Sequence, residues 1–100
     1  MSVYYITTYD VVDPDKYQTY IQQVMPLLQK HKAEILVATP ESKSIEGNPR
    51  AVQVVLKFES EEAALGWYND PAYESVKEIR FAATENGTAV ISKQFVPPTN

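Results

Sequence analysis

The residues with the clearest potential for chemistry lie between Phe58 and Arg80. The only tryptophan, Trp67, is there, followed by Tyr68 and Tyr73. Such side chains offer a large contact area with few rotamers to immobilise, so all three are candidates for lining a pocket for a flat apolar ligand. The alternative is a role in the core. For Trp67 this means anchoring a helix on a sheet, where truncation would cost about 3–5 kcal/mol.

Two arginines are candidates for binding the carboxylate of a ligand through their planar fork of donors. Arg80 follows Ile79 on a largely apolar predicted helix, and Arg50 lies in a predicted turn. The alternatives are that Arg80 pairs with an acid such as Glu46 and that Arg50 is solvated.

His31 is the only histidine, the residue type best suited to exchange a proton near neutral pH. It is the candidate for a catalytic base, and the alternative is a cation at a helix end, where the helix dipole favours it. With Glu34 as its only nearby partner it makes no metal site, because catalytic zinc needs three protein ligands.

Tyr20 is a further candidate for contact with a ligand. The alternative is that Tyr20 belongs to the apolar stripe of its helix and that its hydroxyl reaches water or a partner chain.

Several function classes are not expected. The net charge is -4 and the nine basic residues form no run, so a nucleic-acid partner is not expected. No apolar stretch approaches the roughly 20 residues of a membrane span, and no basic leader precedes an apolar block. With no cysteine, only three glycines and no nucleophile or nucleotide motif, neither a thiol site nor a cofactor is expected. The expected location is the cytoplasm.

The elements that must position these residues follow from capping and periodicity. Asp13-Pro14 opens a helix whose apolar stripe continues past Pro26, with a kink expected there. Ser60 caps another helix, and Asp70-Pro71 ends it and starts the next. Strands are expected over 3–9, 34–39, 51–58 and 88–96, with an arm over 42–46, a turn over 47–50, a turn or helix end at 86–87 and a polar tail over 97–100.

On the last helix Tyr73, Val76, Ile79 and Ala83 are expected to be buried and Lys77 to face outward. The order βαββαβ predicts residues 1–100 to be one ferredoxin-like α+β domain, a four-stranded antiparallel sheet with helices on one face.

The other sheet face is expected to carry residues such as Tyr5, Gln53, Val55 and Lys57, a mixed surface that a second copy would cover. A homodimer is therefore expected, with about 1,600 Å² buried in total.

The chain resembles the DUF1330 family of small dimeric α+β barrel proteins over about residues 3–95. The likeness rests on an ordered series of short motifs. These are Asp13-Pro14 with Tyr17 and Tyr20, Pro26, Ile45-Glu46-Gly47 before Arg50, 55–60, Ala63-Ala64, Trp67-Tyr68, 70–73 and Arg80. The chain departs from the family pattern at 30–33, where an aromatic and two glycines are usual. The resemblance implies a homodimeric barrel and no assigned activity.

Three functions stay open. The first is binding of a small aromatic or carboxylated ligand in a cavity between two sheets, with Tyr20, Arg50, Trp67, Tyr68, Tyr73 and Arg80 as the candidate contacts. The second is a cofactor-independent monooxygenase- or isomerase-like enzyme in which His31 removes a proton. The third is a structural or regulatory dimer without a ligand.

Overall fold

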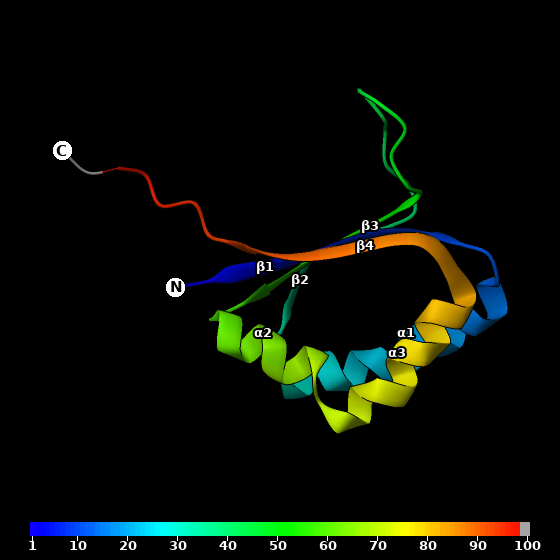
Figure 1. The fold of residues 1–100 in the computed structure, drawn as a ribbon, viewed down its shortest axis with the longest axis horizontal. Helices are drawn as coiled ribbons and strands as arrows, with labels where there is room; N and C mark the ends of the chain where they lie inside the picture. Colours follow the sequence, from blue (N-terminus) through cyan, green and yellow to red (C-terminus); the bar gives the residue numbers. More distant parts are fainter. Residues whose placement is uncertain (99–100) are drawn as a thin grey trace.

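The computed structural model describes residues 1–98 and consists of a sheet layer and a helix layer (Figure 1). Four antiparallel strands pair in the order β2-β3-β1-β4, and three helices cover one face of this sheet. This confirms the α+β, ferredoxin-like prediction. In chain order the elements are β1 (Val3–Val11), α1 (Pro14–Lys30), β2 (Glu34–Thr39), β3 (Val52–Phe58), α2 (Glu61–Tyr68), α3 (Pro71–Ala83) and β4 (Thr84–Lys93).

The helices begin where the local signals predict. The Asp13 carboxylate accepts a hydrogen bond from the Lys16 amide at 3.2 Å, and α1 continues without interruption through Pro26. The Ser60 hydroxyl accepts one from the Ala63 amide at 3.0 Å at the start of α2. Asp70 does the same for the Ala72 amide at 2.9 Å, so α2 ends and α3 begins at the Asp-Pro pair. Each cap satisfies an amide that has no partner inside its helix.

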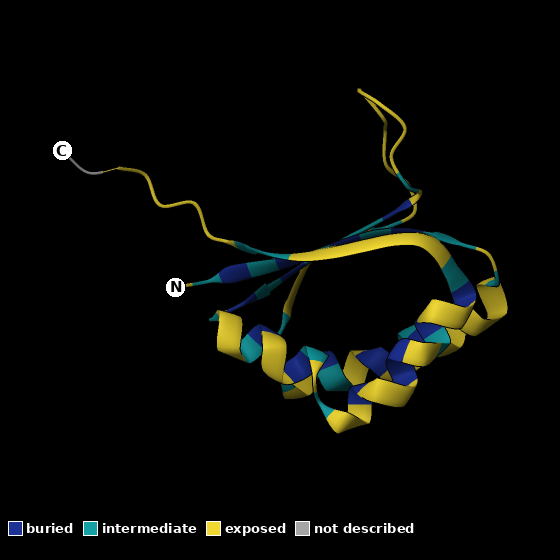
Figure 2. Cartoon of the chain, in the orientation of Figure 1, coloured by how far each residue is buried: buried dark blue, intermediate teal, exposed yellow. Residues whose placement is uncertain are grey.

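The core lies between the sheet and the helices, and its largest fully buried side chains are Trp67, Tyr73 and Phe58. Tyr5 also belongs to it, because its ring contacts Trp67 edge-on with centroids 5.1 Å apart. The expectation that Tyr5 lies on the open sheet face is therefore wrong. Figure 2 shows the buried residues gathered where helices and sheet meet, while β4 is largely exposed.

The open face of the sheet carries a row of aliphatic residues that crosses all four strands. Ile6 pairs with Val55 on one side and Val90 on the other, and Val55 pairs with Val37. Val90 is 54% exposed. This row is called the open-face row below. Because its members lie directly opposite one another, they form one continuous apolar band.

The segment 40–51 forms no strand and projects from the sheet, away from the helices, as do residues 94–98 (Figure 1). The predicted continuation of a strand over 42–46 is therefore wrong, although β2 and β3 do pair as the two arms of a hairpin. Of the predicted tail, residues 97–98 have no regular structure, and 99–100 lie outside the described residues.

The last strand begins earlier than predicted. β4 starts at Thr84, directly after α3, and Asn86-Gly87 lies inside it. Asn86 has a φ of 58°, and the pairing register of β1 with β4 shifts at this point. The dipeptide therefore forms a β-bulge within the strand, where a left-handed residue is accommodated, and not a turn before it.

Candidate functional site

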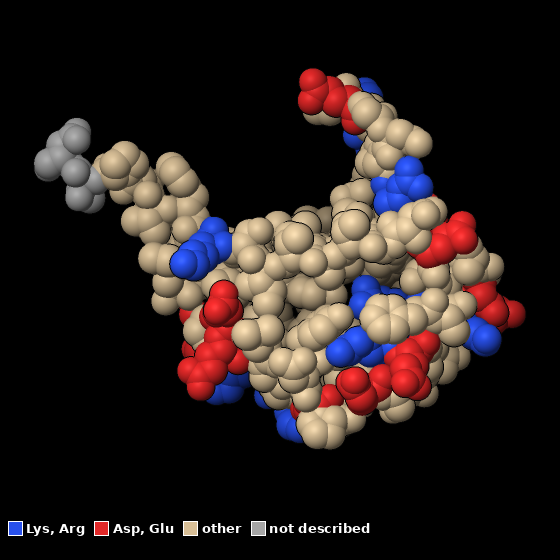
Figure 3. Space-filling model, viewed as in Figure 1, with Lys and Arg blue, Asp and Glu red and all other residues tan. Residues whose placement is uncertain are grey.

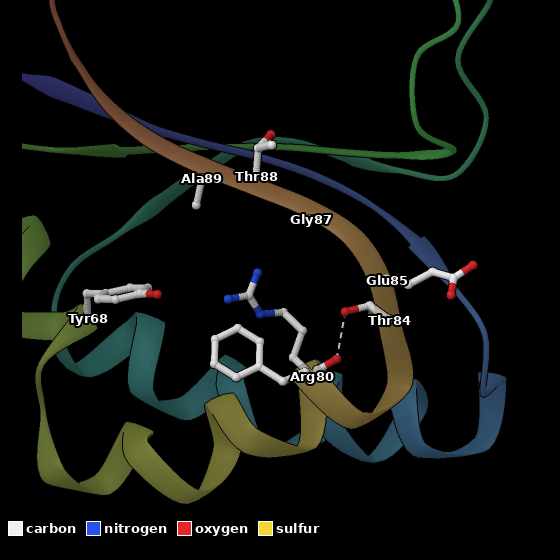
Figure 4. Close-up of a pocket in the computed structure, with 8 residues that line it drawn as sticks. Tyr68, Arg80, Thr84, Glu85, Gly87, Thr88 and Ala89 are labelled. Atoms are coloured by element: carbon white, nitrogen blue, oxygen red, sulfur yellow. Dashed lines mark hydrogen bonds between the residues drawn. The ribbon is translucent and has the colours of Figure 1, made fainter.

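A cationic side chain lies buried between the last helix and the last strand. Arg80, in the final turn of α3, is 5% exposed, and its guanidinium points into the space between α3 and β4 (Figure 4). The helix end places it there because α3 leads directly into β4, and the Thr84 hydroxyl donates to the Arg80 carbonyl at 2.7 Å across that junction. A buried arginine is unusual because desolvation of its charge costs free energy unless an anion compensates it.

Within residues 1–98 Arg80 forms no ion pair. One terminal nitrogen lies 3.4 Å from the Thr7 hydroxyl, and Nε has no hydrogen-bond partner among the described residues. The guanidinium carbon lies 5.0 Å from the centre of the Phe81 ring and 5.6 Å from that of Tyr9. Arg80 is thus surrounded by aromatic rings and a hydroxyl, none of which carries a full negative charge at neutral pH.

The guanidinium remains charged in this environment. Burial alone lowers the pKa of Arg80, but the negative charge that the Tyr5 and Tyr73 oxygens carry only when they ionise opposes this, and the net shift is upward. Burial raises the pKa of Tyr73 to about 12 and that of the Tyr5 hydroxyl above its ordinary value. At neutral pH the site therefore holds one permanent cation among protonated tyrosines.

Arg80 lines a pocket of about 350 Å³, hereafter the cation pocket, whose walls are Tyr68, Arg80, Phe81, Thr84, Glu85, Gly87, Thr88 and Ala89. The hydroxyl of Tyr68 points into it toward the guanidinium, whereas the Glu85 carboxylate points away (Figure 4). Figure 3 shows basic side chains set in a hollow between the sheet layer and the helix layer. The pocket therefore offers hydrogen-bond donors and positive charge.

Lys77 adds a second cation next to this pocket. Its Nζ lies 3.8 Å above the centre of the Tyr68 ring, and the residue is only 9% exposed. Its one ion pair within residues 1–98 is a 3.7 Å contact with the exposed Glu74. The expectation that Lys77 faces outward is therefore wrong, because its aliphatic stem packs inward as amphipathic side chains often do.

Trp67, Tyr73 and Tyr20 lie deeper and form the aromatic core behind the pocket. The rings of Trp67 and Tyr73 are 4.6 Å apart, and the hydroxyls of Tyr20 and Tyr73 share a buried hydrogen bond of 2.8 Å. Trp67 Nε1 is buried without a hydrogen-bond partner among the described residues. In this structure Trp67 and Tyr73 pack as their core alternative describes. The alternative for Tyr20, a hydroxyl that reaches water or a partner chain, is wrong because this hydroxyl is buried against Tyr73. Only Tyr68 of the aromatic candidates lines the cation pocket.

The other two sequence candidates lie elsewhere. Arg50 pairs with Asp10 at 3.0 Å at the base of the projecting 40–51 segment. His31 Nε2 lies 2.7 Å from the Asp70 carboxylate, which also caps α3. His31 therefore joins the end of α1 to the start of α3 and does not line the cation pocket.

The location of the expected ligand cavity also needs correction. Tyr20, Trp67, Tyr68, Tyr73 and Arg80 all lie on the helix side of the sheet, so they cannot line a cavity between the open faces of two sheets. The alternative that Arg80 pairs with Glu46 is wrong as well, since Glu46 belongs to the projecting segment and Arg80 forms no ion pair within residues 1–98.

The sequence reasoning missed Lys77, Phe81 and the pocket wall provided by β4. One signal was available, because Tyr73, Lys77 and Arg80 follow each other at spacings of four and three and so share one helix face. The contribution of β4 had no such signal, since its early start at Thr84 moves Gly87 from a turn to the pocket wall.

The described residues show no metal-binding cluster of three or more His, Cys, Asp or Glu. None of the helices in residues 1–98 is long and apolar enough to cross a membrane. What the cation pocket can do chemically is bind and orient an anion through a guanidinium, a phenol hydroxyl and a neighbouring ammonium.

Solved structures with the same fold come from several organisms. A protein of unknown function from Rhodopseudomonas palustris shares 16% identity, with a TM-score of 0.76 over 96% of this chain and 84% of the other. A dimeric ferredoxin-like protein of unknown function from Thermobifida fusca has 15% identity and a TM-score of 0.59, covering 91% and 89%. A putative antibiotic biosynthesis monooxygenase from Bacteroides thetaiotaomicron has 14% identity and a TM-score of 0.62, covering 99% and 94%. At these identities the likeness shows the fold alone.

The comparison with curated proteins gave no match. The family model described as "Domain of unknown function (DUF1330)" matches residues 2–94, which confirms the resemblance noted from the short motifs. The chain belongs to the DUF1330 family.

Proposed function

We propose that this protein is a cytoplasmic homodimer that binds a small organic carboxylate in the cation pocket of each chain. The observation that carries the proposal is the buried Arg80 guanidinium, which faces a pocket and has no acidic partner within residues 1–98. A buried charge without a counter-ion is costly, and an anionic ligand would remove that cost.

A carboxylate suits the donors around the pocket. The guanidinium presents a planar fork that matches two carboxylate oxygens, and the Tyr68 hydroxyl points toward the same space. Lys77, stacked on the Tyr68 ring, adds positive potential without occupying the pocket. The volume of about 350 Å³ lies within the range of small-molecule sites.

Isothermal titration calorimetry with phenylacetate and its neutral analogue phenylacetamide tests the proposal. The two ligands have nearly the same shape, so a preference for the acid reports the charge. We expect measurable binding of phenylacetate and at least tenfold weaker binding of the amide, because a charge-assisted hydrogen bond contributes about 1.5–3 kcal/mol. Equal affinities, or no binding of the acid, would contradict the proposal.

The homodimer is supported by the open-face row. Ile6, Val37, Val55 and Val90 present a continuous apolar band to solvent, and the projecting segments 40–51 and 94–98 flank it on the same side of the sheet (Figure 1). A second copy placed on this face would cover the band, as apolar sheet faces require. Two structural neighbours are themselves described as dimeric.

Light scattering coupled to size exclusion tests the dimer. We expect the mass of two 11.3 kDa chains for the wild type and of one chain for Val55→Lys, which places a charge in the middle of the band. Circular dichroism should show the same secondary structure in both. A wild-type mass of one chain would refute this part of the proposal.

The enzymatic alternative loses its proposed base in this geometry. His31 is engaged with Asp70 and does not line the cation pocket, so proton removal by His31 from a ligand bound there has no structural support. If calorimetry detects no binding of a carboxylate, the protein is better described as a structural or regulatory dimer without a ligand.

A further inference from the structure

The cation pocket adjoins a second, apolar pocket along β4. This second pocket, hereafter the aliphatic pocket, has a volume of about 280 Å³ and is lined by Tyr5, Leu65, Tyr68, Ala89, Val90 and Ile91. Tyr68 and Ala89 line both pockets, so they lie at the boundary between the two. The two adjoining pockets, which lie along β4 beside helices α2 and α3, are together called the groove.

The chemical character changes from one end of this groove to the other. The cationic end has Arg80 in its wall and Lys77 beside it. The opposite end carries no charged residue, and its walls include the aliphatic side chains of Leu65 and Ile91. Leu65 is 40% exposed, so part of its apolar surface is accessible to a ligand.

We infer that the ligand class of this site is an elongated aliphatic carboxylate, with its head group at Arg80 and its chain lying along β4 toward Leu65 and Ile91. The inference rests on the proposed carboxylate site and adds the shape and polarity of the rest of the ligand. From Gly87 to Ile91 the strand advances by roughly 13 Å, which corresponds to a chain of about eight carbons.

Other occupants fit less well. A compact aromatic acid would occupy the cation pocket and leave the aliphatic pocket filled with water. A small inorganic anion would do the same. A third void, beneath α1 and lined by residues such as Tyr20, Val24 and Ile35, measures about 70 Å³ and is too small to accept the chain. The groove along β4 combines a buried cation with an adjoining apolar wall, which matches both a charge and an apolar tail.

The test is a calorimetric series with acetate, butyrate, hexanoate, octanoate and decanoate. Each methylene removed from water in the groove should tighten binding about threefold to fourfold, and the gain should level off near octanoate, where the groove ends. A matched pair of variants locates the chain. Leu65→Gln keeps a helix-forming side chain of similar size but makes the aliphatic end polar. Ile45→Gln makes the same kind of change at an 84% exposed site in the projecting 40–51 segment.

We expect Leu65→Gln to weaken octanoate binding about tenfold while leaving acetate binding unchanged, and Ile45→Gln to change neither. If all five acids bind with equal affinity, or if Leu65→Gln leaves the chain-length dependence intact, the elongated ligand is refuted while the carboxylate site stands. If no acid of any length binds, the carboxylate site fails and the inference fails with it.

Discussion

Replacing Arg80 by methionine should stabilise the ligand-free protein while abolishing carboxylate binding. Methionine retains an unbranched stem of similar length, so it fills the same space without the charge. The residue is 5% exposed and has no acidic partner within residues 1–98, so in the wild type its charge is held in the interior without compensation. Such an arrangement favours ligand binding but lowers the free energy of unfolding, a trade-off that is common at functional sites.

The expected size of the effect follows from the contacts of the guanidinium. The substitution removes a long hydrogen bond of 3.4 Å to Thr7 and two contacts with aromatic rings at 5.0 and 5.6 Å. Together these contribute about 1–2 kcal/mol. Desolvation of an unpaired ion costs several kcal/mol even after relaxation. The net change should be a stabilisation of about 1–2 kcal/mol, which raises the Tm of a domain of this size by roughly 5–15 °C.

Urea unfolding and thermal denaturation at equal protein concentration measure this change, because the stability of a dimer depends on concentration. Arg50→Met is the matched control. It removes a half-buried ion pair with Asp10 and should lower stability by about 1 kcal/mol or less. Saturation with phenylacetate at 100 times its Kd should stabilise the wild type by about 2.7 kcal/mol and leave Arg80→Met unaffected. A destabilisation of Arg80→Met by about 1 kcal/mol or more would refute the reasoning, because it would mean that the charge is already compensated.

Three further predictions concern the pocket wall, a helix junction and the core. Gly87→Val should weaken carboxylate binding at least tenfold, because it adds a side chain to the pocket wall. Stability should change by no more than about 1 kcal/mol, because a Cβ at this position meets only ordinary contacts at 3.7 and 3.8 Å and valine suits a strand. Unchanged binding in calorimetry would argue against the pocket. Hydrogen bonds from His31 and from the Ala72 amide of α3 hold the pKa of the Asp70 carboxyl well below its usual range. The free energy of unfolding of the wild type should therefore fall as pH drops below about 4, and that of Asp70→Asn should depend less on pH. The same pH dependence for both proteins in urea unfolding from about pH 2 to 7 would contradict this. Tyr20→Phe should lower the free energy of unfolding by about 1–3 kcal/mol, because it leaves the buried Tyr73 hydroxyl unpaired. The double variant with Tyr73→Phe should lose less than the sum of the two single variants. Additive losses in chemical unfolding would exclude the hydrogen bond.

The sequence was sufficient for the features that depend on neighbouring residues. The caps at Asp13, Ser60 and Asp70 each need one side chain and an amide two or three residues later, so the helix starts were predictable. The motif order pointed to the family because it spans most of the chain.

The positions of the other candidate residues depend on pairings that have no local signal. His31 and Asp70 are 39 residues apart, and Arg50 and Asp10 are 40 apart, so neither partner indicates the other in the sequence. Tyr5 was assigned to the wrong sheet face because both faces of its strand carry bulky side chains. Lys77 was assigned to solvent by its charge, although its stem is apolar and the rings of Tyr68 and Tyr73 accept its ammonium group.

A crystal structure of the protein with octanoate tests the central claim most directly. We expect the carboxylate oxygens to lie within about 2.7–2.9 Å of the Arg80 guanidinium nitrogens, with the chain along β4 between Tyr68 and Ile91. An octanoate whose head group is held by another cation, while Arg80 contacts only Thr7 and the surrounding rings, would contradict the account.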